Sequence, residues 1–397
     1  MGCGSSKRVE PRADPLAAVD FELSTPMLVM PFRVFKKQGR IVKSTRTWRD
    51  EALSKSWLVA HVKTAGDVPA PGKVVIFISH TWWDRDFKDE TCDPSLPHDV
   101  GAPDHQSGER KDLKWRIICA GVETLIKEKR LKAEDVVLWI DWQSIHQDNN
   151  AEKLKGVRSL IKYATLCDYM LVPTEEEELV GWATKLPHLI PGYGLRGWCR
   201  CEYFIFSLAA EMREREVPLY AIQRDGSLKQ YPRVELADIK YMPSRGQLSN
   251  PADWAPVQAL EDKMIEEHGK VLAEIKCKAG AGGSVDLGAK MIRDCHVEAL
   301  CAAVVKYEVT WLRLDTNQLG DEGAKAIAAM LRANRSLKDL SLLGNKIGDA
   351  GAEAITAMLR VNRSLNYLDL RGNDIGHPAK QSVRDAVMGR KGFQLDM

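Results

Sequence analysis

The residues of this chain that are best placed to do chemistry follow the ends of short apolar runs. One run, residues 73–79, is rich in β-branched residues, and another, residues 136–140, ends just before an aspartate. Such runs are typical of strands buried on both faces of a parallel sheet, and ligands bind outside the carboxyl ends of these strands. We therefore expect polar and aromatic side chains to gather at one edge of a sheet: His80, Trp82, Asp84, Asp141 and Gln147.

Other catalytic and metal-binding patterns are weaker. Cys199 and Cys201 lack a second spaced pair, so two buried thiols are a better interpretation than a zinc site, and we expect no metal. The glycine-rich run at 280–283 lacks the Gly-Lys-Ser/Thr ending of a phosphate loop and is interpreted as a linker. The sequence offers no Ser-His-Asp arrangement that we would defend.

The elements that must position these residues alternate along the middle of the chain. Helical segments are expected at 114–129, 151–164 and 198–213, and two further apolar runs at 169–172 and 218–222 follow the last two of them. This alternation predicts an α/β fold, in which a parallel sheet is covered by helices on both faces.

Three motifs in this region resemble the Toll/interleukin-1 receptor (TIR) domain family. FISHTWWDRD, from residue 77, resembles the family's first strand and loop, and VVLWIDWQSIHQDN, from residue 136, resembles its second strand. Trp198-Cys199-Arg200-Cys201-Glu202 resembles the Trp-Cys-x-x-Glu motif that opens its third helix. The resemblance covers residues 70–225 and implies a flavodoxin-like parallel sheet. The polar insertion at 86–111 departs from the family, and the aromatic first loop is similar to divergent TIR-like domains of protists.

The resemblance allows two functions. Some TIR domains cleave the bond between nicotinamide and ribose in NAD with the glutamate that corresponds to Glu202, whereas others are adaptors without catalysis. In an enzyme, NAD is a substrate and no cofactor is expected, an ionised Glu202 stabilises the ribosyl cation, and Trp82 or Trp83 stacks on nicotinamide. In an adaptor, Glu202 is a carboxylate in the first turn of a helix, favoured by the helix dipole. In the enzyme, the substrate-binding residues are Ser79, His80, Trp82, Asp84 and Asp141.

The N-terminal residues predict lipid attachment. Once Met1 is removed, Gly2 becomes the terminal amine of a myristoylation pattern, and the adjacent Cys3 can be palmitoylated. Two acyl chains hold a protein to a bilayer where one myristoyl chain holds it only marginally. A basic stretch at 33–49 either lies on the anionic inner leaflet or packs on the following domain. We expect the protein at the cytoplasmic face of a membrane, the plasma membrane.

Composition agrees with a protein of the cytosol that has several domains. The length of 397 residues suggests two or three compact units. The 57 Lys and Arg nearly balance the 55 Asp and Glu, which gives no reason to expect a nucleic-acid partner. Nine cysteines without paired spacing fit free thiols in a reducing compartment. No stretch approaches the roughly 20 apolar residues that span a bilayer, and the N-terminus lacks the apolar core of a secretory signal.

The C-terminal part contains an internal repeat. The pattern Leu-x-Leu-x-x-Asn recurs at equal intervals, with near-identical helical segments between its copies. It is typical of leucine-rich repeats and resembles the ribonuclease-inhibitor type of cytosolic immune receptors. Residues 285–307 are expected to form a capping unit in which Cys295 and Cys301 are buried. The asparagines, which should bond the backbone of the turn after each strand, are Asn317, Asn345 and Asn373.

The sequence thus predicts an α/β chain, with a flavodoxin-like parallel sheet followed by a short α/β leucine-rich-repeat solenoid. Its expected role is that of a membrane-anchored signalling or defence protein that self-associates through its TIR-like domain. Its repeats either pack on that domain or recruit a protein partner. The expected segments are an acylated N-terminus at 1–20, a basic lead-in at 21–69, the TIR-like domain at 70–225, a connector at 226–284 that contains an amphipathic helix at 256–275, and the repeats with their capping unit at 285–397.

Overall fold

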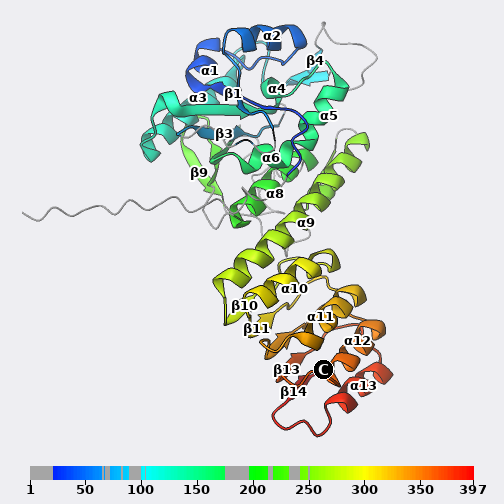
Figure 1. Ribbon diagram of the computed structural model, residues 1–397. Helices are drawn as coiled ribbons and strands as arrows, with labels where there is room; N and C mark the ends of the chain where they lie inside the picture. The colour runs from blue at the N-terminus through cyan, green and yellow to red at the C-terminus, as the bar shows by residue number, and fades with distance from the viewer. Residues whose placement is uncertain are drawn as a thin grey trace, which may run out of the picture.

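The computed structural model contains two α/β units, joined by the long helix α9, Trp254–Ala279 (Figure 1). No helix in the described part of the chain is both long and apolar enough to cross a bilayer. The structure describes residues 21–64, 67, 72–81, 84–88, 100–102, 104–174, 196–212, 218–231, 242–248 and 251–397, with the backbone only for 84–88, 100–102 and 150.

The first unit is built on a seven-stranded sheet with the strand order β2-β1-β6-β3-β7-β8-β9. Its four central strands, β6, β3, β7 and β8, run parallel to one another. Numbered by their order along the chain, these four strands are arranged 2-1-3-4 across the sheet. The outer strands β1, β2 and β9 are antiparallel to their neighbours. The strands are β1 Met27–Pro31, β2 Val59–Val62, β3 Val74–Ile78, β6 Val136–Ile140, β7 Tyr169–Pro173, β8 Leu219–Ile222 and β9 Leu228–Tyr231.

Helices cover both faces of this sheet, which confirms the α/β prediction. On one face, Phe77 of β3 stacks on Trp139 of β6 with ring centroids 4.4 Å apart, and Phe206 packs edge-on against Phe77. On the other face, Ile76 and Leu138 pack under α3 in a separate apolar cluster. The helices are α1 Phe32–Gln38, α2 Arg46–Ser54, α3 Leu113–Lys129, α4 Asp141–Ser144, α5 Asn150–Arg158, α6 Leu160–Thr165 and α8 Gly197–Met212.

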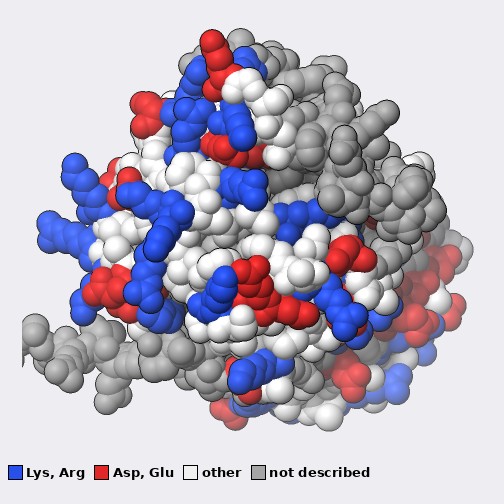
Figure 2. All heavy atoms as spheres, turned by 90° about the horizontal axis from the view of Figure 1, so that it is seen from above, with Lys and Arg blue, Asp and Glu red and all other residues white. Residues whose placement is uncertain are grey.

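The sheet extends into the segment that the sequence sets apart as a basic lead-in. β1 pairs with β6 through Met30 and Leu138, and the side chains of Phe32 and Phe35 are buried. The buried Arg49 donates a hydrogen bond of 2.9 Å to the carbonyl of Ser144. The lead-in therefore packs on the domain through its apolar residues, while Lys and Arg on the face that carries α1 and α2 alternate with Asp and Glu (Figure 2).

Part of the expected polar insertion at 86–111 lies within the described residues. Strand β4, Asp84–Lys88, pairs antiparallel with β5, Val100–Ala102. Beyond the hairpin, the carboxylate of Asp104, which is 1 % exposed, accepts hydrogen bonds of 2.9 and 2.8 Å from the backbone N–H groups of Lys114 and Trp115. The end of the insertion thereby caps the N-terminus of α3, since the first N–H groups of a helix have no partner within it.

The second unit is a parallel five-stranded sheet in the order β10 to β14, with helices packed on one side (Figure 1). Leu312, Leu340 and Leu368 stand in register on three neighbouring strands, which aligns the leucines of successive repeats into one core. The elements are β10 Ser284–Asp286, α10 Val297–Lys306, β11 Trp311–Arg313, α11 Asp321–Ala333, β12 Asp339–Ser341, α12 Asp349–Leu359, β13 Tyr367–Asp369, α13 His377–Val387 and β14 Gln394–Asp396.

Two expectations about the start of this unit are wrong. The glycine run at 280–283 is a tight turn and not a loose linker. The N–H of Gly282 donates a hydrogen bond of 2.9 Å to the carbonyl of Tyr307, which fixes the turn to the repeat unit. Cys295 is exposed and Cys301 is half-buried. The turn η7, Asp294–His296, directs His296 into the core instead, where its ring lies so close to Gly269 that a Cβ there would be 2.6 Å from it.

Helix α9 belongs to both cores. Leu260 and Met264 in its first half pack into the core under the large sheet, and Leu272 and Cys277 in its second half pack into the repeat core. The amphipathic helix expected at 256–275 is present and is longer than predicted at both ends. Its buried face is shared between the two units.

A partly buried ionic contact also crosses the junction of the two units. Glu211 of α8 bonds His268 of α9 at 3.0 Å and Lys290, between β10 and α10, at 2.6 Å. Burial raises the pKa of Glu211, but the hydrogen bonds and charges of His268 and Lys290 outweigh it and hold this pKa at about 2.

Candidate functional site

The carboxyl end of β3 meets helix α8 at a carboxyl group. Ser79, which directly follows β3 and is 1 % exposed, donates its hydroxyl hydrogen bond to Oε2 of the half-buried Glu202. Helix α8 begins at Gly197 and has no acidic residue in its first turn, so Glu202 lies in the second turn. The interpretation of Glu202 as a first-turn carboxylate is therefore wrong. The helix dipole acts chiefly within the first turn, so it does not account for a carboxylate at this position.

A second polar pair lies at the end of the neighbouring strand β6. Nε2 of His80 lies 2.9 Å from Oδ1 of Asp141, with the His80 side chain 2 % exposed and the Asp141 side chain 39 % exposed. The same Asp141 oxygen accepts a hydrogen bond of 2.6 Å from the backbone N–H of Trp142. Because β3 and β6 are parallel neighbours, the pairs Ser79–Glu202 and His80–Asp141 stand at one edge of the sheet, as predicted.

The two carboxyl groups have opposite pKa shifts. Burial and the negative charge of Asp141 raise the pKa of Glu202 well above its usual value, and the hydrogen bond from Ser79 only partly offsets them. Burial also raises the pKa of Asp141, but the charge and hydrogen bond of His80 outweigh it, and the net shift is downward. Such a separation of two neighbouring pKa values is the pattern of sites in which two carboxyl groups have different roles.

Of the other predicted site residues, only Gln147 is described with its side chain. The backbone of Asp84 begins strand β4, and its side chain lies outside the described residues, as do Trp82 and Trp83. Gln147 donates to the carbonyls of Asp141 and Ile145, both at 3.2 Å, and therefore holds the loop after β6.

The alternative chemistries receive no support from the described residues. Cys199 and Cys201 are both buried thiols, and burial raises the pKa of Cys201 well above its usual value, so that it stays protonated. No group of three His, Cys, Asp or Glu side chains in this part of the chain lies close enough to hold a metal ion. Gly2 and Cys3, the predicted lipid-bearing residues, lie outside the described residues.

A buried lysine, which the sequence did not indicate as a site residue, contacts the loop after β3. Lys114 is 0 % exposed, and its ammonium group donates to the carbonyl of Thr81, which also lies 3.2 Å from Nδ1 of His80. A signal for it exists, because Lys114 precedes Ile118 by four residues and Gly121 by seven, which places it on the buried face of α3. A buried ammonium group adds positive charge to the loop that holds His80.

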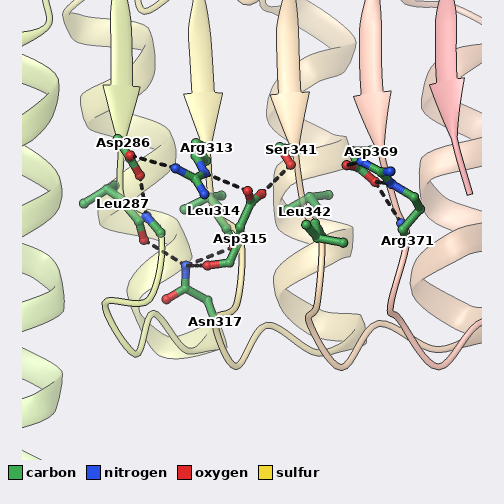
Figure 3. A network of polar contacts seen from close by, with 12 residues as sticks. Asp286, Leu287, Arg313, Leu314, Asp315, Asn317, Ser341, Leu342, Asp369 and Arg371 are labelled. Atoms are coloured by element: carbon green, nitrogen blue, oxygen red, sulfur yellow. Dashed lines mark hydrogen bonds and ion pairs between the residues drawn. The ribbon is translucent and has the colours of Figure 1, made fainter. Parts of the chain in front are cut away.

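The repeat unit presents a second polar surface, on the face of its sheet opposite the helices. Arg313, at the end of β11, bonds Asp315 in the turn that follows at 2.7 Å and Asp286 on the neighbouring strand β10 at 3.1 Å. Arg371 bonds Asp369 at 2.6 Å. Figure 3 shows these side chains as two groups, one around Arg313 beside β10 and β11 and the other around Arg371 after β13. Arg313 and Arg371 remain 45 % and 54 % exposed, so this face offers charged groups that are already held in position.

The comparison with protein families bears on the C-terminal unit. Residues 309–328, 333–355 and 361–378 match the family model described as Leucine Rich repeat. The C-terminal tail carries leucine-rich repeats. Among solved structures, that of the leiomodin-1 actin-binding site 2 matches at 21% identity over 33% of this chain and 76% of that chain, with a TM-score of 0.27. No curated protein matches the chain.

Proposed function

We propose that this chain is a membrane-anchored signalling or defence protein whose first unit is a TIR-like domain that self-associates and hydrolyses NAD. The observation that carries the proposal is the position of Glu202, which lies at the carboxyl edge of the parallel strands and is hydrogen-bonded to Ser79. The central strands follow the order second, first, third, fourth, which is that of flavodoxin-like sheets and supports the resemblance of the three sequence motifs.

The reaction needs little from the protein beyond charge and position. The bond between the ribosyl carbon and the pyridinium nitrogen breaks, and its electron pair neutralises the ring, so nicotinamide leaves without a general acid. Water then bonds to the ribosyl carbon and loses a proton to the solvent, which gives ADP-ribose. The ionised Glu202 stabilises the oxocarbenium-like centre between these steps, as carboxylates do in glycoside hydrolysis.

The neighbours of Glu202 suit this role. A half-buried carboxylate interacts more strongly with a cation than one in water, because less solvent screens it. The negative charge of Asp141 disfavours a second negative charge on Glu202, and a cationic substrate between them relieves this repulsion. Binding of NAD is therefore expected to lower the pKa of Glu202 and to generate the active, ionised form.

The substitution Glu202→Gln tests the catalytic proposal. It keeps the volume of the side chain and removes its charge, so nicotinamide release by the full-length protein should fall roughly a hundredfold or more. Glu298→Gln, an exposed glutamate on α10, is the matched control and should leave the rate unchanged. If the wild-type protein clustered on lipid vesicles releases no nicotinamide, the catalytic proposal is wrong.

The substitution Gly2→Ala tests the membrane anchor. It removes the amine that accepts myristate, so the protein should move from the membrane fraction to the soluble fraction. Cys3→Ser should weaken attachment less completely, because the myristoyl chain remains. Retention of the Gly2→Ala protein on membranes after a wash at high salt would contradict lipid anchoring and assign attachment to the basic stretch.

A non-catalytic adaptor is the second candidate, and the polar face of the repeats favours it. Arg313 and Arg371 are held by neighbouring aspartates, and a partner bound there would lose little side-chain entropy. In this role the repeats recruit a protein partner to the membrane, and Glu202 has no catalytic task. Capture of the same protein by the wild type and Glu202→Gln, together with absence of NAD turnover, would support the adaptor.

A further inference from the structure

A cavity lies between the first half of α3 and the turn that joins β8 to β9. Its volume is about 570 Å³, within the range of small-molecule sites. Arg224 and Asp225 line it and follow the carboxyl end of β8, the edge at which parallel sheets bind ligands. None of its lining residues belongs to the site around Glu202, so the cavity is a separate feature of the domain.

The walls of the cavity are fixed by close backbone packing. Gly226 has a φ of +83°, and a Cβ built there would lie 2.6 Å from Cβ of Ala120 on α3. One residue further along α3, a Cβ at Gly121 would lie 2.4 Å from the side chain of Ile222, the last residue of β8. Helix α3 therefore touches both the turn and the end of β8, and these contacts hold the walls of the cavity in place.

Three arginines from separate segments surround the cavity: Arg110 before α3, Arg116 within it, and Arg224 in the turn. Arg116 donates to the carbonyls of Glu109 and Lys111 at 3.4 and 3.2 Å, which orient its guanidinium group without neutralising its charge. Within the described part of the chain, Arg224 makes no hydrogen bond or ion pair.

The remaining lining balances this charge only in part and adds an apolar surface. Glu109 and Asp225 contribute two carboxyl groups, which leaves a surplus of positive charge. Hydrogen bonds from Ser227 lower the pKa of Asp225 and already occupy one of its oxygens. Leu113, Ile117 and Ala120 supply apolar contact along α3.

We propose that this cavity binds a small molecule that carries a phosphate group. Guanidinium groups match phosphate oxygens with paired hydrogen bonds, and a guanidinium without a partner in the free protein gains most from such a ligand. The apolar side of α3 then covers the body of the molecule. The proposal does not depend on NAD hydrolysis, because the cavity shares no residue with the Glu202 site.

Calorimetric titration of the full-length protein tests this site, with AMP as the probe. Saturable binding with one site per chain is expected, weakened at least tenfold in Arg224→Ala and partly restored in Arg224→Lys. Arg130→Ala, at the far end of α3, is the matched control and should bind AMP as the wild type does. Melting curves establish that each variant is folded.

A second arm separates a soluble ligand from a lipid headgroup. Inositol trisphosphate in solution and vesicles that contain phosphatidylinositol bisphosphate are titrated in parallel. Binding of either one that depends on Arg224, without binding of AMP, would keep the phosphate site and identify its source as a headgroup. Absence of saturable binding of all three probes, or equal affinities in Arg224→Ala and Arg130→Ala, would overturn the proposal.

Discussion

The carboxyl group of Glu202 has two polar neighbours that act on its charge in opposite directions. The hydroxyl of Ser79 donates a hydrogen bond that favours the ionised form, whereas the charge of Asp141 disfavours it. Burial adds to the effect of Asp141, and the net result is a raised pKa. The position of this pKa decides over which pH range the proposed catalytic carboxylate is ionised.

The pH dependence of nicotinamide release should report this arrangement. Because the ionised form of Glu202 is the active one and its pKa is raised, the rate should rise with pH above the usual glutamate value of 4.5. Asp141→Asn removes the opposing charge and should move the rise to lower pH. Ser79→Ala removes the stabilising hydrogen bond and should move it to higher pH. Shifts of both variants in the same direction would contradict the assigned neighbours.

At this scale the sequence predicted the residues that follow strands and missed those that arrive from elsewhere. His80 and Asp141 were predicted because each directly follows an apolar run, within two residues of a strand end. Lys114 and Arg224 were not. The spacing of Lys114 from Ile118 and Gly121 indicates that it is buried on α3, but its contact with the loop after β3 depends on how α3 packs across the sheet, as does the position of Arg224.

Among the elements, the turns of the repeats show how a short array is held together. Nδ2 of Asn345 donates to the carbonyls of Leu314 in the preceding repeat and Leu342 in its own repeat, at 2.9 and 3.0 Å. Its Oδ1 accepts a bond of 3.1 Å from the N–H of Leu319. The predicted role of the asparagines is confirmed, and each of them also joins its repeat to the one before.

Asn345→Leu should therefore destabilise the repeat unit clearly. It leaves buried backbone groups of two repeats without partners, and the loss of three hydrogen bonds in a buried site costs about 3 kcal/mol. Lys346→Ala, at the exposed neighbouring position, is the control and should change the melting temperature little. Equal, small shifts of the melting temperature in both variants would show that Asn345 does not support the array.

The elements themselves were predicted unevenly. β3, β6, β7 and β8 follow from continuous apolar runs, because strands buried on both faces have no polar positions to obscure them. β1 and β2 were not identified. β2 is a short edge strand, β1 runs directly into the basic helix α1, and the charge pattern dominated the interpretation of this segment. The leucine-rich strands were the easiest to predict, because a repeat supplies the same evidence three times.

On the scale of the whole molecule, the contact of Glu211 with His268 and Lys290 makes stability depend on pH. A glutamate with a lowered pKa stabilises the folded state above its unfolded value of 4.5, and this contribution is lost as the pH falls towards about 2. Lys290 belongs to the repeat unit and Glu211 to the sheet unit, so the loss falls on the junction between them.

Glu211→Gln should lower the free energy of unfolding at neutral pH by about 3 kcal/mol, as the size of the pKa shift implies. The difference from the wild type should shrink as the pH is lowered from 4.5 towards about 2, where the wild-type carboxylate is itself protonated. Urea unfolding at several pH values measures both effects, with Glu298→Gln as the control. A difference that does not change with pH would exclude a charge effect.

The division of α9 between two cores has a consequence for how the chain can be taken apart. A cut before Trp254 would remove Leu260 and Met264 from the core of the large sheet, and a cut after Ala279 would remove Leu272 and Cys277 from the core of the repeats. Neither cut leaves both cores intact. A chimera in which the repeats are replaced by those of another protein would also need the second half of a helix equivalent to α9. Because each core loses residues of α9 when the other unfolds, melting curves of the full-length protein should show one cooperative transition.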